Sequence, residues 1–219
     1  MWVDVLDLDD FSREEIETVL NLADRMREVL DRRIARVPAL RGQTVINLFY
    51  EPSTRTRASF ELAGKVLGAD VISLTASASS VTKGESLIDT VRTLRAMRTD
   101  AIVMRHSMSG APYLAAEHTD ASIINAGDGT HEHPTQALLD ARTMLDHGLE
   151  LEGLRIAIIG DIAHSRVARS NVHLLSKFGA DIVLCGPASL LPRELKEMCP
   201  GVTLTTNMNE AIRDASVIM

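Results

Sequence analysis

Short apolar runs alternate with longer segments in which apolar residues recur every three or four positions along most of the chain. The short runs are typical of buried strands, and the periodic segments are typical of amphipathic helices. The runs predict strands at residues 44–50, 69–74, 100–104, 122–125, 154–159, 181–185 and 202–205, with a further strand starting at 217. The periodic segments predict helices at residues 12–26, 58–67, 85–97, 110–117, 134–147, 165–178 and 207–214, with a helical segment after residue 192. Strands that alternate with helices of this length favour parallel sheets that carry helices on both faces.

Residues 147–153 separate two series of alternating strands and helices, and the glycines at both ends of this segment favour a hinge. We therefore expect an α/β protein of two domains, each a parallel β-sheet flanked by helices. The expected parts are a first domain at 1–135, a connecting helix and hinge at 136–150, and a second domain at 151–219. The chain stops inside an apolar segment, so we expect a C-terminally truncated chain whose second domain is incomplete.

The stretch Ser53-Thr54-Arg55-Thr56-Arg57 lies between the first expected strand and the helix that follows it. Pro52 ends the strand, and Ser53 or Thr54 is a good helix N-cap. Hydroxyls, guanidinium groups and the free N–H groups of a helix start would gather here, and together they suit an anion. Arginine suits phosphate in particular, because its fork pairs with two oxygens at once. The alternative is an ordinary capped helix with exposed arginines.

Two further segments place polar groups after strands. Arg105 and His106 follow the third expected strand, and ligands bind at the carboxyl ends of strands in open parallel sheets. A plain surface arginine is the alternative. Residues 75–84 form a polar loop that contains Ser79 and Lys83. This loop is not a phosphate-binding P-loop, because the preceding glycine is missing and the lysine is followed by Gly84 and Glu85 and not by a serine or threonine.

Residues 127–136 form a glycine-rich turn that leads into a helix, and Pro134 suits the first turn of that helix. The two histidines of this stretch flank Glu132, but no third ligand is evident nearby, so we expect no metal. His133 and Gln136 lie close to the helix start and suit hydrogen bonds to a bound carbonyl and amide. An arginine and a histidine that meet at one oxygen would stabilise developing negative charge.

The second series begins with a buried strand that ends at Gly160. It lacks the later glycines of a dinucleotide-binding turn, and its second strand does not end in an acidic residue, so we expect no NAD. Arg166 lies in the first turn of the next helix. It would face the crevice beside the first domain if the two sheets were arranged edge to edge.

Composition narrows the classes of protein. Apolar residues make up 45% and charged residues 24%, which is ordinary for a globular protein, and the net charge is −7. Because there is no basic tail, nucleic acid is not an expected partner. No apolar run is long enough to span a membrane, and the N-terminus has no targeting pattern. The two cysteines, Cys185 and Cys199, form no close pair and fit a reducing compartment, so we expect a cytoplasmic protein.

Four motifs, FYEPSTRTRASFE, SSVTKGESLIDT, VMRH and HPTQALLDA, occur in this order. Their order and spacing resemble the catalytic chains of the aspartate carbamoyltransferase family, and the resemblance covers nearly all of the chain. It implies transfer of the carbamoyl group of carbamoyl phosphate to the α-amine of L-aspartate. The products would be N-carbamoyl-L-aspartate and phosphate, in de novo pyrimidine biosynthesis, with no cofactor. Residues 1–135 would bind carbamoyl phosphate, and residues 151–219 would form the N-terminal part of an aspartate-binding domain.

The resemblance also assigns roles to residues. Ser53, Thr54, Arg55 and Thr56 would hold the phosphate. Thr56, Arg105 and His133 would polarise the carbonyl oxygen, and Gln136 would meet the carbamoyl amide. Arg166 would bind a carboxylate of the acceptor, while Ser79 and Lys83 would reach the site of the neighbouring subunit in a homotrimer with shared active sites. Regulatory or dihydroorotase chains are possible further partners.

Family chains continue beyond this point with an arginine and a glutamine that grip the acceptor and with a C-terminal helix. We therefore expect this chain to bind carbamoyl phosphate but to turn over aspartate poorly, and to be less stable than a full-length relative. Three alternatives stay open: an ornithine carbamoyltransferase, a non-catalytic module that binds carbamoyl phosphate, and an unrelated phosphate-binding α/β protein. The loop lysine and Arg166 suit a dicarboxylate acceptor better than a cationic one.

Overall fold

Two units, each with its own parallel sheet, make up the fold. The computed structural model describes residues 4–75, 85–199 and 201–219. The first unit comprises residues 1–6 and 22–129, and the second comprises residues 7–21 and 130–219. Each unit is built on a four-stranded sheet whose neighbouring strands all pair in parallel. The predicted class, two parallel α/β sheets flanked by helices, is confirmed. The segment 136–150, expected as connecting helix and hinge, falls within the second unit.

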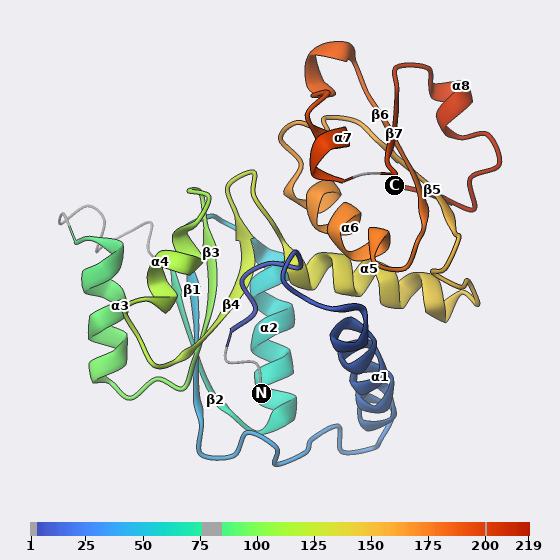
Figure 1. Ribbon diagram of the computed structural model, residues 1–219. Coiled ribbons are helices and arrows are strands. Elements are labelled where there is room, and N and C mark those ends of the chain that lie inside the picture. The colour runs from blue at the N-terminus through green and yellow to red at the C-terminus, as the bar shows by residue number, and fades with distance from the viewer. Residues whose placement is uncertain (1–3, 76–84, 200) are drawn as a thin grey trace. The chain divides into compact units, whose positions relative to one another are not determined.

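The sheet of the first unit has the strand order β2-β1-β3-β4 (Figure 1). Its strands are β1 (Thr44–Phe49), β2 (Asp70–Thr75), β3 (Ala101–His106) and β4 (Ser122–Asp128). Because β1 and β3 are neighbours in the centre, Phe49 pairs with Arg105 at the carboxyl edge of the sheet. This register brings the segment after β1 close to the end of β3.

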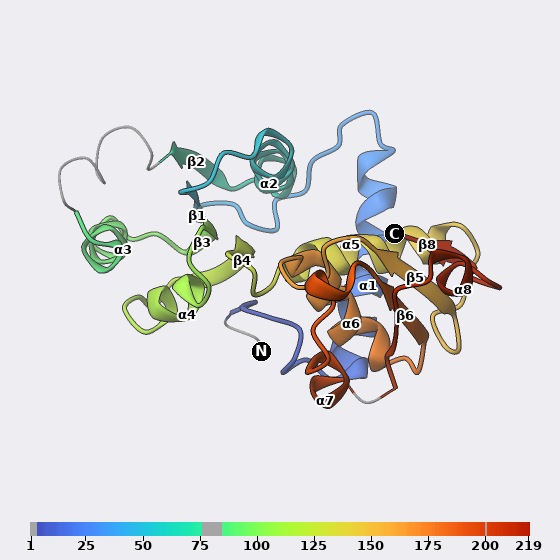
Figure 2. The ribbon, with the colours of Figure 1, turned by 90° about the horizontal axis from the view of Figure 1, so that it is seen from above.

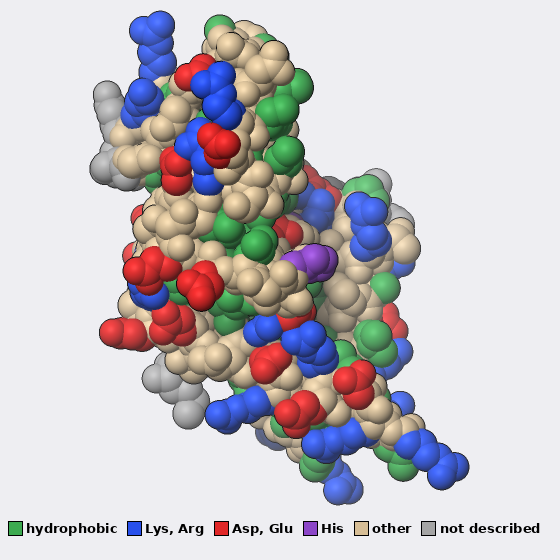
Figure 3. Space-filling model, turned by 90° about the vertical axis from the view of Figure 1, so that its right-hand side faces the viewer, with side chains coloured by type: hydrophobic (Ala, Val, Ile, Leu, Met, Phe, Trp, Pro, Cys, Tyr) green, Lys and Arg blue, Asp and Glu red, His purple; other side chains and the backbone are tan. Residues whose placement is uncertain are grey.

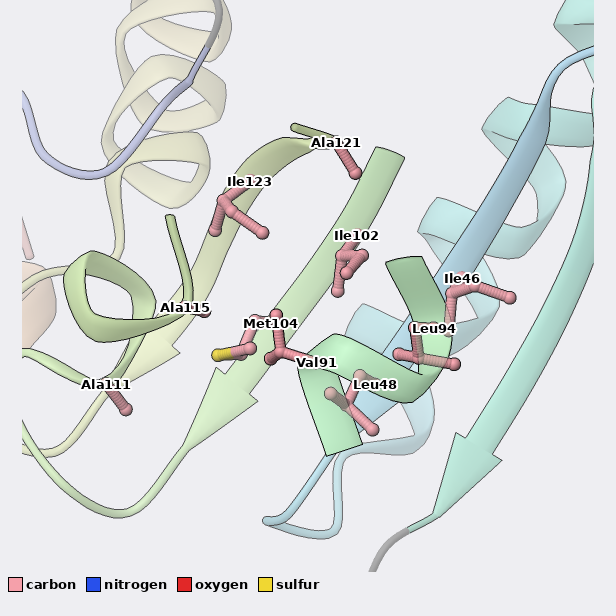
Figure 4. Packing of buried hydrophobic residues seen from close by; sticks show 10 residues of the cluster. All are labelled: Ile46, Leu48, Val91, Leu94, Ile102, Met104, Ala111, Ala115, Ala121 and Ile123. Atoms are coloured by element: carbon pink, nitrogen blue, oxygen red, sulfur yellow. The ribbon is translucent and has the colours of Figure 1, made fainter. Parts of the chain in front are cut away.

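Helices cover both faces of this sheet. Figure 2 shows α2 (Thr54–Leu67) on one face and α3 (Leu87–Ala96) and α4 (Ala111–Ala116) on the other. The core on the α3 side consists of Ile46, Leu48, Val91, Leu94, Ile102, Met104, Ala111, Ala115, Ala121 and Ile123 (Figure 4). Aromatic residues are scarce, so aliphatic side chains and one methionine fill this core.

Two glycines have defined structural roles in helix α2. A Cβ atom on Gly64 would come within 2.5 Å of Val71 Cγ2, so the absence of a side chain lets the helix lie close to β2. Gly68 adopts φ 85° and ends the helix, as its position in the sequence predicted. The helix starts at Thr54, four residues before the expected start, because its first turn carries no apolar residues and so shows no periodicity.

The sheet of the second unit has the strand order β7-β6-β5-β8. Its strands are β5 (Arg155–Ile159), β6 (Asp181–Cys185), β7 (Thr203–Thr205) and β8 (Val217–Ile218). The helices are α5 (Pro134–Asp146), α6 (Arg166–Ser176), α7 (Leu195–Met198), α8 (Met208–Ala211) and the 3-10 helix η2 (Ala188–Leu190). The side chain of Val172 in α6 faces Leu184 of β6, whereas Ala211 of α8 packs against Val183 on the other face.

Helix α1 (Arg13–Leu30) begins with the predicted capping box. The Ser12 N–H donates to Glu15 Oε2 at 2.8 Å, and the Glu15 N–H donates to Ser12 Oγ at 3.2 Å. The division between the two units falls within this helix, after Asn21.

Candidate active site

The loop between β1 and α2 has the geometry of an anion site. Ser53 is the N-cap of α2 in an extended conformation, and its side chain makes no capping hydrogen bond. The N–H groups of the first helical turn have no carbonyl partner within the helix, and they point out of its positive end. Thr54 and Arg55 are exposed, and Thr56 is half-buried. The loop therefore presents hydroxyl, guanidinium and backbone donors to solvent at the place that the sequence predicted.

Arg105 lies beside this loop and is held on two sides. Its Nε atom is 3.2 Å from Glu51 Oε2, and its Nη1 donates to the carbonyl oxygen of Ala126 at 3.2 Å. Only 16% of its side chain is exposed. These contacts fix a guanidinium group at the carboxyl edge of the sheet, one strand away from the start of the loop. Glu51 was not singled out from the sequence, although its place before Pro52 in the same motif was a signal for it.

A separate pocket of about 720 Å³ opens at the same edge of the first sheet, on the side of α3 and α4. Tyr50 and His106 line it together with Glu85, Leu87, Leu114 and residues 107–111. Burial lowers the pKa of His106, and its Nδ1 accepts a hydrogen bond from the Met108 N–H at 2.9 Å. None of the described candidate phosphate ligands lines this pocket. The hypothesis of an anion site therefore rests on the geometry of the loop between β1 and α2.

His133 and Gln136 lie at the start of α5 in the second unit. His133 is the N-cap and Pro134 is the first helical residue, as predicted. The His133 N–H donates to Ser170 Oγ of α6 at 2.8 Å, which ties the start of α5 to α6. The Gln136 amide donates from Nε2 to Asp140 Oδ1 at 2.8 Å, one turn further along α5.

Arg166 is the first residue of α6. The N-cap Ser165 accepts a hydrogen bond from the Ala168 N–H at 3.1 Å and so fixes the start of the helix. Arg166 and Ser170 are four positions apart and therefore share a face of α6. Because Ser170 contacts the His133 backbone, the second unit places Arg166 and His133 on the same side of α6.

The predicted site residues thus fall into three groups. Those in the first unit are Ser53, Thr54, Arg55, Thr56 and Arg105, and those in the second are His133, Gln136 and Arg166. Ser79 and Lys83 lie outside the described residues.

Glu132, which lies between two histidines in the sequence, is engaged in hydrogen bonds inside the second unit. Its carboxylate turns inward, where Oε2 accepts hydrogen bonds from the Leu8 N–H at 3.2 Å and from Ser170 Oγ at 2.8 Å. Within the described parts of the chain, no group of three or more His, Cys, Asp or Glu side chains has the arrangement of a metal site. The chemistry of the donors therefore gives no support for a metal at residues 131–133.

Burial raises the pKa of the Glu132 carboxyl from 4.5 to about 7, and its side chain is 1% exposed. The nearby carboxylate of Asp7 adds to this effect, whereas the hydrogen bonds from Ser170 and Leu8 and the charge of His131 oppose it. His173 Nε2 lies 3.8 Å from Glu132 Oε1, and burial lowers the pKa of this imidazole. Sequence reasoning missed this buried acid, which shares Ser170 with the backbone of His133.

Glu132 should make the stability of the chain fall as pH rises through neutrality. Between about pH 4.5 and 7 the folded chain keeps a proton on this carboxyl that the unfolded chain releases, so the free energy of unfolding decreases over this window. The full contribution is roughly 3 kcal/mol, at about 1.4 kcal/mol for each pH unit between the two pKa values. Glu132→Gln removes the titration, so the variant should lose less stability than the wild type between pH 5 and pH 8.

Urea unfolding at both pH values measures this difference. His173 has the opposite pH dependence and remains in both proteins, so it opposes the effect of Glu132 in each of them. The exposed Glu117→Gln serves as control and should keep the wild-type pH dependence. Equal pH dependence of the wild type and Glu132→Gln would refute the raised pKa.

The described residues of the face shown in Figure 3 form no surface suited to a polyanion. On the face shown in Figure 3, basic and acidic side chains are interspersed, and the described side chains of that face form no continuous basic patch. Because the chain has a net charge of −7, an anion must be attracted by local cations such as Arg55 and Arg105.

Cys185 and Cys199 are both buried as free thiols. Of the helices in the described ranges, none has the length and apolar character needed to cross a membrane.

Comparison with known proteins identifies the family. The model of the carbamoyl-phosphate-binding domain of aspartate/ornithine carbamoyltransferases matches residues 4–146. The aspartate carbamoyltransferase catalytic subunit of Solibacter usitatus is 64% identical over 215 residues, which cover 98% of this chain and 71% of that relative. The catalytic subunit of aspartate transcarbamoylase from M. jannaschii has a TM-score of 0.89 at 38% identity, covering 99% of this chain and 72% of that one. Aspartate transcarbamoylase from Trypanosoma cruzi, in complex with carbamoyl phosphate and aspartate, has a TM-score of 0.89 at 32% identity, covering 98% of this chain and 71% of that one.

The fold defines an α/β protein of two parallel sheets, with an arginine-containing loop at the carboxyl edge of the first sheet. The comparisons make the assignment specific: the chain belongs to the aspartate/ornithine carbamoyltransferase family, a family of transferases. The predicted resemblance is thereby confirmed.

Proposed function

We propose that the chain transfers the carbamoyl group of carbamoyl phosphate to the α-amine of L-aspartate, giving N-carbamoyl-L-aspartate and phosphate. The observation that carries the proposal is the loop Ser53–Thr56, whose uncapped helix start and exposed arginine lie beside the anchored Arg105. The family assignment and the naming of similar proteins as aspartate carbamoyltransferases support it further.

The proposed chemistry needs positioning and charge stabilisation. Ser53, Thr54, Arg55 and Thr56 bind the phosphate group. Thr56, Arg105 and His133 donate to the carbonyl oxygen, which gains negative charge as the amine nitrogen attacks the carbamoyl carbon. The bond from that carbon to the phosphate oxygen then breaks, and the leaving phosphate takes up the proton that the amine loses. Arg166 pairs with a carboxylate of the acceptor, and no cofactor takes part.

Aspartate is favoured over ornithine as the acceptor. Aspartate carries a second carboxylate on its side chain, whereas the side chain of ornithine carries a cation. Arg166 offers positive charge at the start of α6, which suits the side-chain carboxylate and repels the cation. A competition assay with carbamoyl phosphate and equal concentrations of aspartate and ornithine tests this. We expect carbamoyl-aspartate as the dominant product. Dominant citrulline would point to an ornithine enzyme, and tight binding of carbamoyl phosphate without either product would point to a non-catalytic module.

The assembly is proposed to be a homotrimer in the cytoplasm, with Ser79 and Lys83 of one subunit serving the site of its neighbour. This rests on the motif SSVTKGESLIDT and its resemblance to family sequences.

Light scattering measures the oligomeric state of the chain. Mixing inactive Lys83→Ala and Arg55→Ala chains should restore part of the activity, because some mixed sites would receive both intact residues. A monomer, or mixtures as inactive as their components, would refute shared sites. Regulatory or dihydroorotase chains are possible further partners.

A further inference from the structure

Asp140 lies between two amide side chains in the second unit. Its Oδ1 accepts a hydrogen bond from Gln136 Nε2 at 2.8 Å, and its Oδ2 accepts one from Asn171 Nδ2 at 2.8 Å. Gln136 and Asp140 are one turn apart on α5, whereas Asn171 comes from α6, which packs against α5. The three side chains form a chain of hydrogen bonds that starts at a predicted substrate ligand and ends in the buried interface of two helices.

The carboxylate of Asp140 determines the orientation of the Gln136 amide. An ionised carboxylate only accepts hydrogen bonds, so the amide must turn its NH₂ group toward Asp140 and its carbonyl oxygen away. Asn171 is fully buried, and its NH₂ group donates both to Asp140 and to the Val167 carbonyl oxygen at 3.0 Å. Asn171 therefore holds Asp140 in place, and Asp140 in turn holds the Gln136 amide in one orientation.

The exposed end of Gln136 is consequently an acceptor. Its Oε1 receives no hydrogen bond from the residues that the structure describes, and the side chain is half-exposed. An acceptor at this place can bind the NH₂ group of a carbamoyl ligand but gains nothing from a methyl group. If the Gln136 amide were free to turn, its NH₂ group would face the NH₂ group of the carbamoyl ligand for part of the time. The site would then no longer distinguish a carbamoyl group from a methyl-bearing acyl group.

We propose that Asp140, oriented by Asn171, is a positioning residue that makes Gln136 select carbamoyl phosphate over acyl phosphates that lack the NH₂ group. The inference rests on the proposed function, because it assumes that Gln136 meets the carbamoyl amide. Acetyl phosphate is the matched probe, since it has the charge and approximate size of carbamoyl phosphate and carries a methyl group in place of NH₂.

The test is calorimetric titration of the full chain with carbamoyl phosphate and with acetyl phosphate. We expect the wild type to bind carbamoyl phosphate roughly tenfold more tightly, the usual scale of one added hydrogen bond. Asp140→Asn keeps the side-chain volume but turns one acceptor into a donor. It should weaken the binding of carbamoyl phosphate alone, so that the ratio of the two affinities comes close to one. The control Asp146→Asn lies on the same helix, where Asp146 accepts from Arg142, and should keep the wild-type ratio.

Other outcomes separate the possible failures. If Asp140→Asn lowers both affinities equally, Asp140 has only a structural role and the inference is wrong, and an unchanged ratio also overturns it. Gln136→Met removes the amide at similar volume and should give the same ratio near one, which keeps the test valid if Asp140→Asn does not fold. A wild type that binds both phosphates equally refutes the inference but leaves the phosphate site standing. A wild type that binds neither refutes the proposed function as well.

Discussion

Arg105→Ala should lower the rate of carbamoyl-aspartate formation roughly 100- to 1000-fold, the usual effect of removing one donor to a developing oxyanion. The contacts of Arg105 show how its guanidinium is positioned. Glu51 and the Ala126 carbonyl hold the guanidinium in place, and both are acceptors. Without Arg105, the Glu51 carboxylate would stand beside the phosphate loop with a negative charge, so carbamoyl phosphate should also bind less tightly.

Initial rates at saturating substrate, together with calorimetry of carbamoyl phosphate binding, measure the two effects separately. Arg95→Ala is the control, because Arg95 is an exposed arginine of the same unit that pairs with Asp120 at 2.5 Å. It should keep the wild-type rate within about twofold. A rate of Arg105→Ala within tenfold of wild type would mean that Arg105 does not stabilise the transition state.

Arg55→Ala should weaken carbamoyl phosphate binding by roughly 100-fold, corresponding to about 2.7 kcal/mol. Arg55 is exposed in the first turn of α2, where its guanidinium can add to the helix N-terminus in binding a doubly charged phosphate. In a chain with a net charge of −7, local cations of this kind must supply the attraction.

Arg57→Ala is the matched control for this prediction. Arg57 lies two residues further along the same helix, but its Nη1 donates to Thr75 Oγ1 at 3.2 Å. The control should therefore bind carbamoyl phosphate within a few-fold of wild type, and calorimetry at fixed ionic strength compares the two variants. Equal losses in both variants would show that general positive charge, and not Arg55 itself, attracts the ligand.

Much of the fold follows from local sequence. The capping box at Ser12, the proline start of α5 and the glycine end of α2 were all predictable because each acts within a few residues of its own position. The end of β4 was missed: we expected the strand to stop near residue 125, but it continues to Asp128. There the Asn125 side chain donates to Asp128 Oδ1 at 2.8 Å and accepts from the Gly127 N–H, which supports an extended segment that looked like a loop.

The sequence singled out the candidate ligands but not the residues that contact them in the structure. Arg105 and Gln136 stand in recognisable motifs. Glu51 pairs with Arg105 from a neighbouring strand end, and Asn171 of α6 contacts Asp140, which binds the Gln136 amide. The buried Glu132 carboxylate accepts a hydrogen bond from the Leu8 N–H, 124 residues away in the chain, and no local pattern reports such a contact. Local sequence therefore indicates candidate ligands, while the contacts that orient those side chains and shift their pKa values emerge only from the packed fold.

The most direct test of this account is a calorimetric titration of the unaltered full chain with carbamoyl phosphate, compared with inorganic phosphate under the same conditions. We predict saturable binding at one site per chain, tighter for carbamoyl phosphate than for phosphate, and competition between the two. A folded chain that gives no binding, or that binds both ligands equally, would contradict the claim that the loop Ser53–Thr56 and its neighbours form a carbamoyl phosphate site.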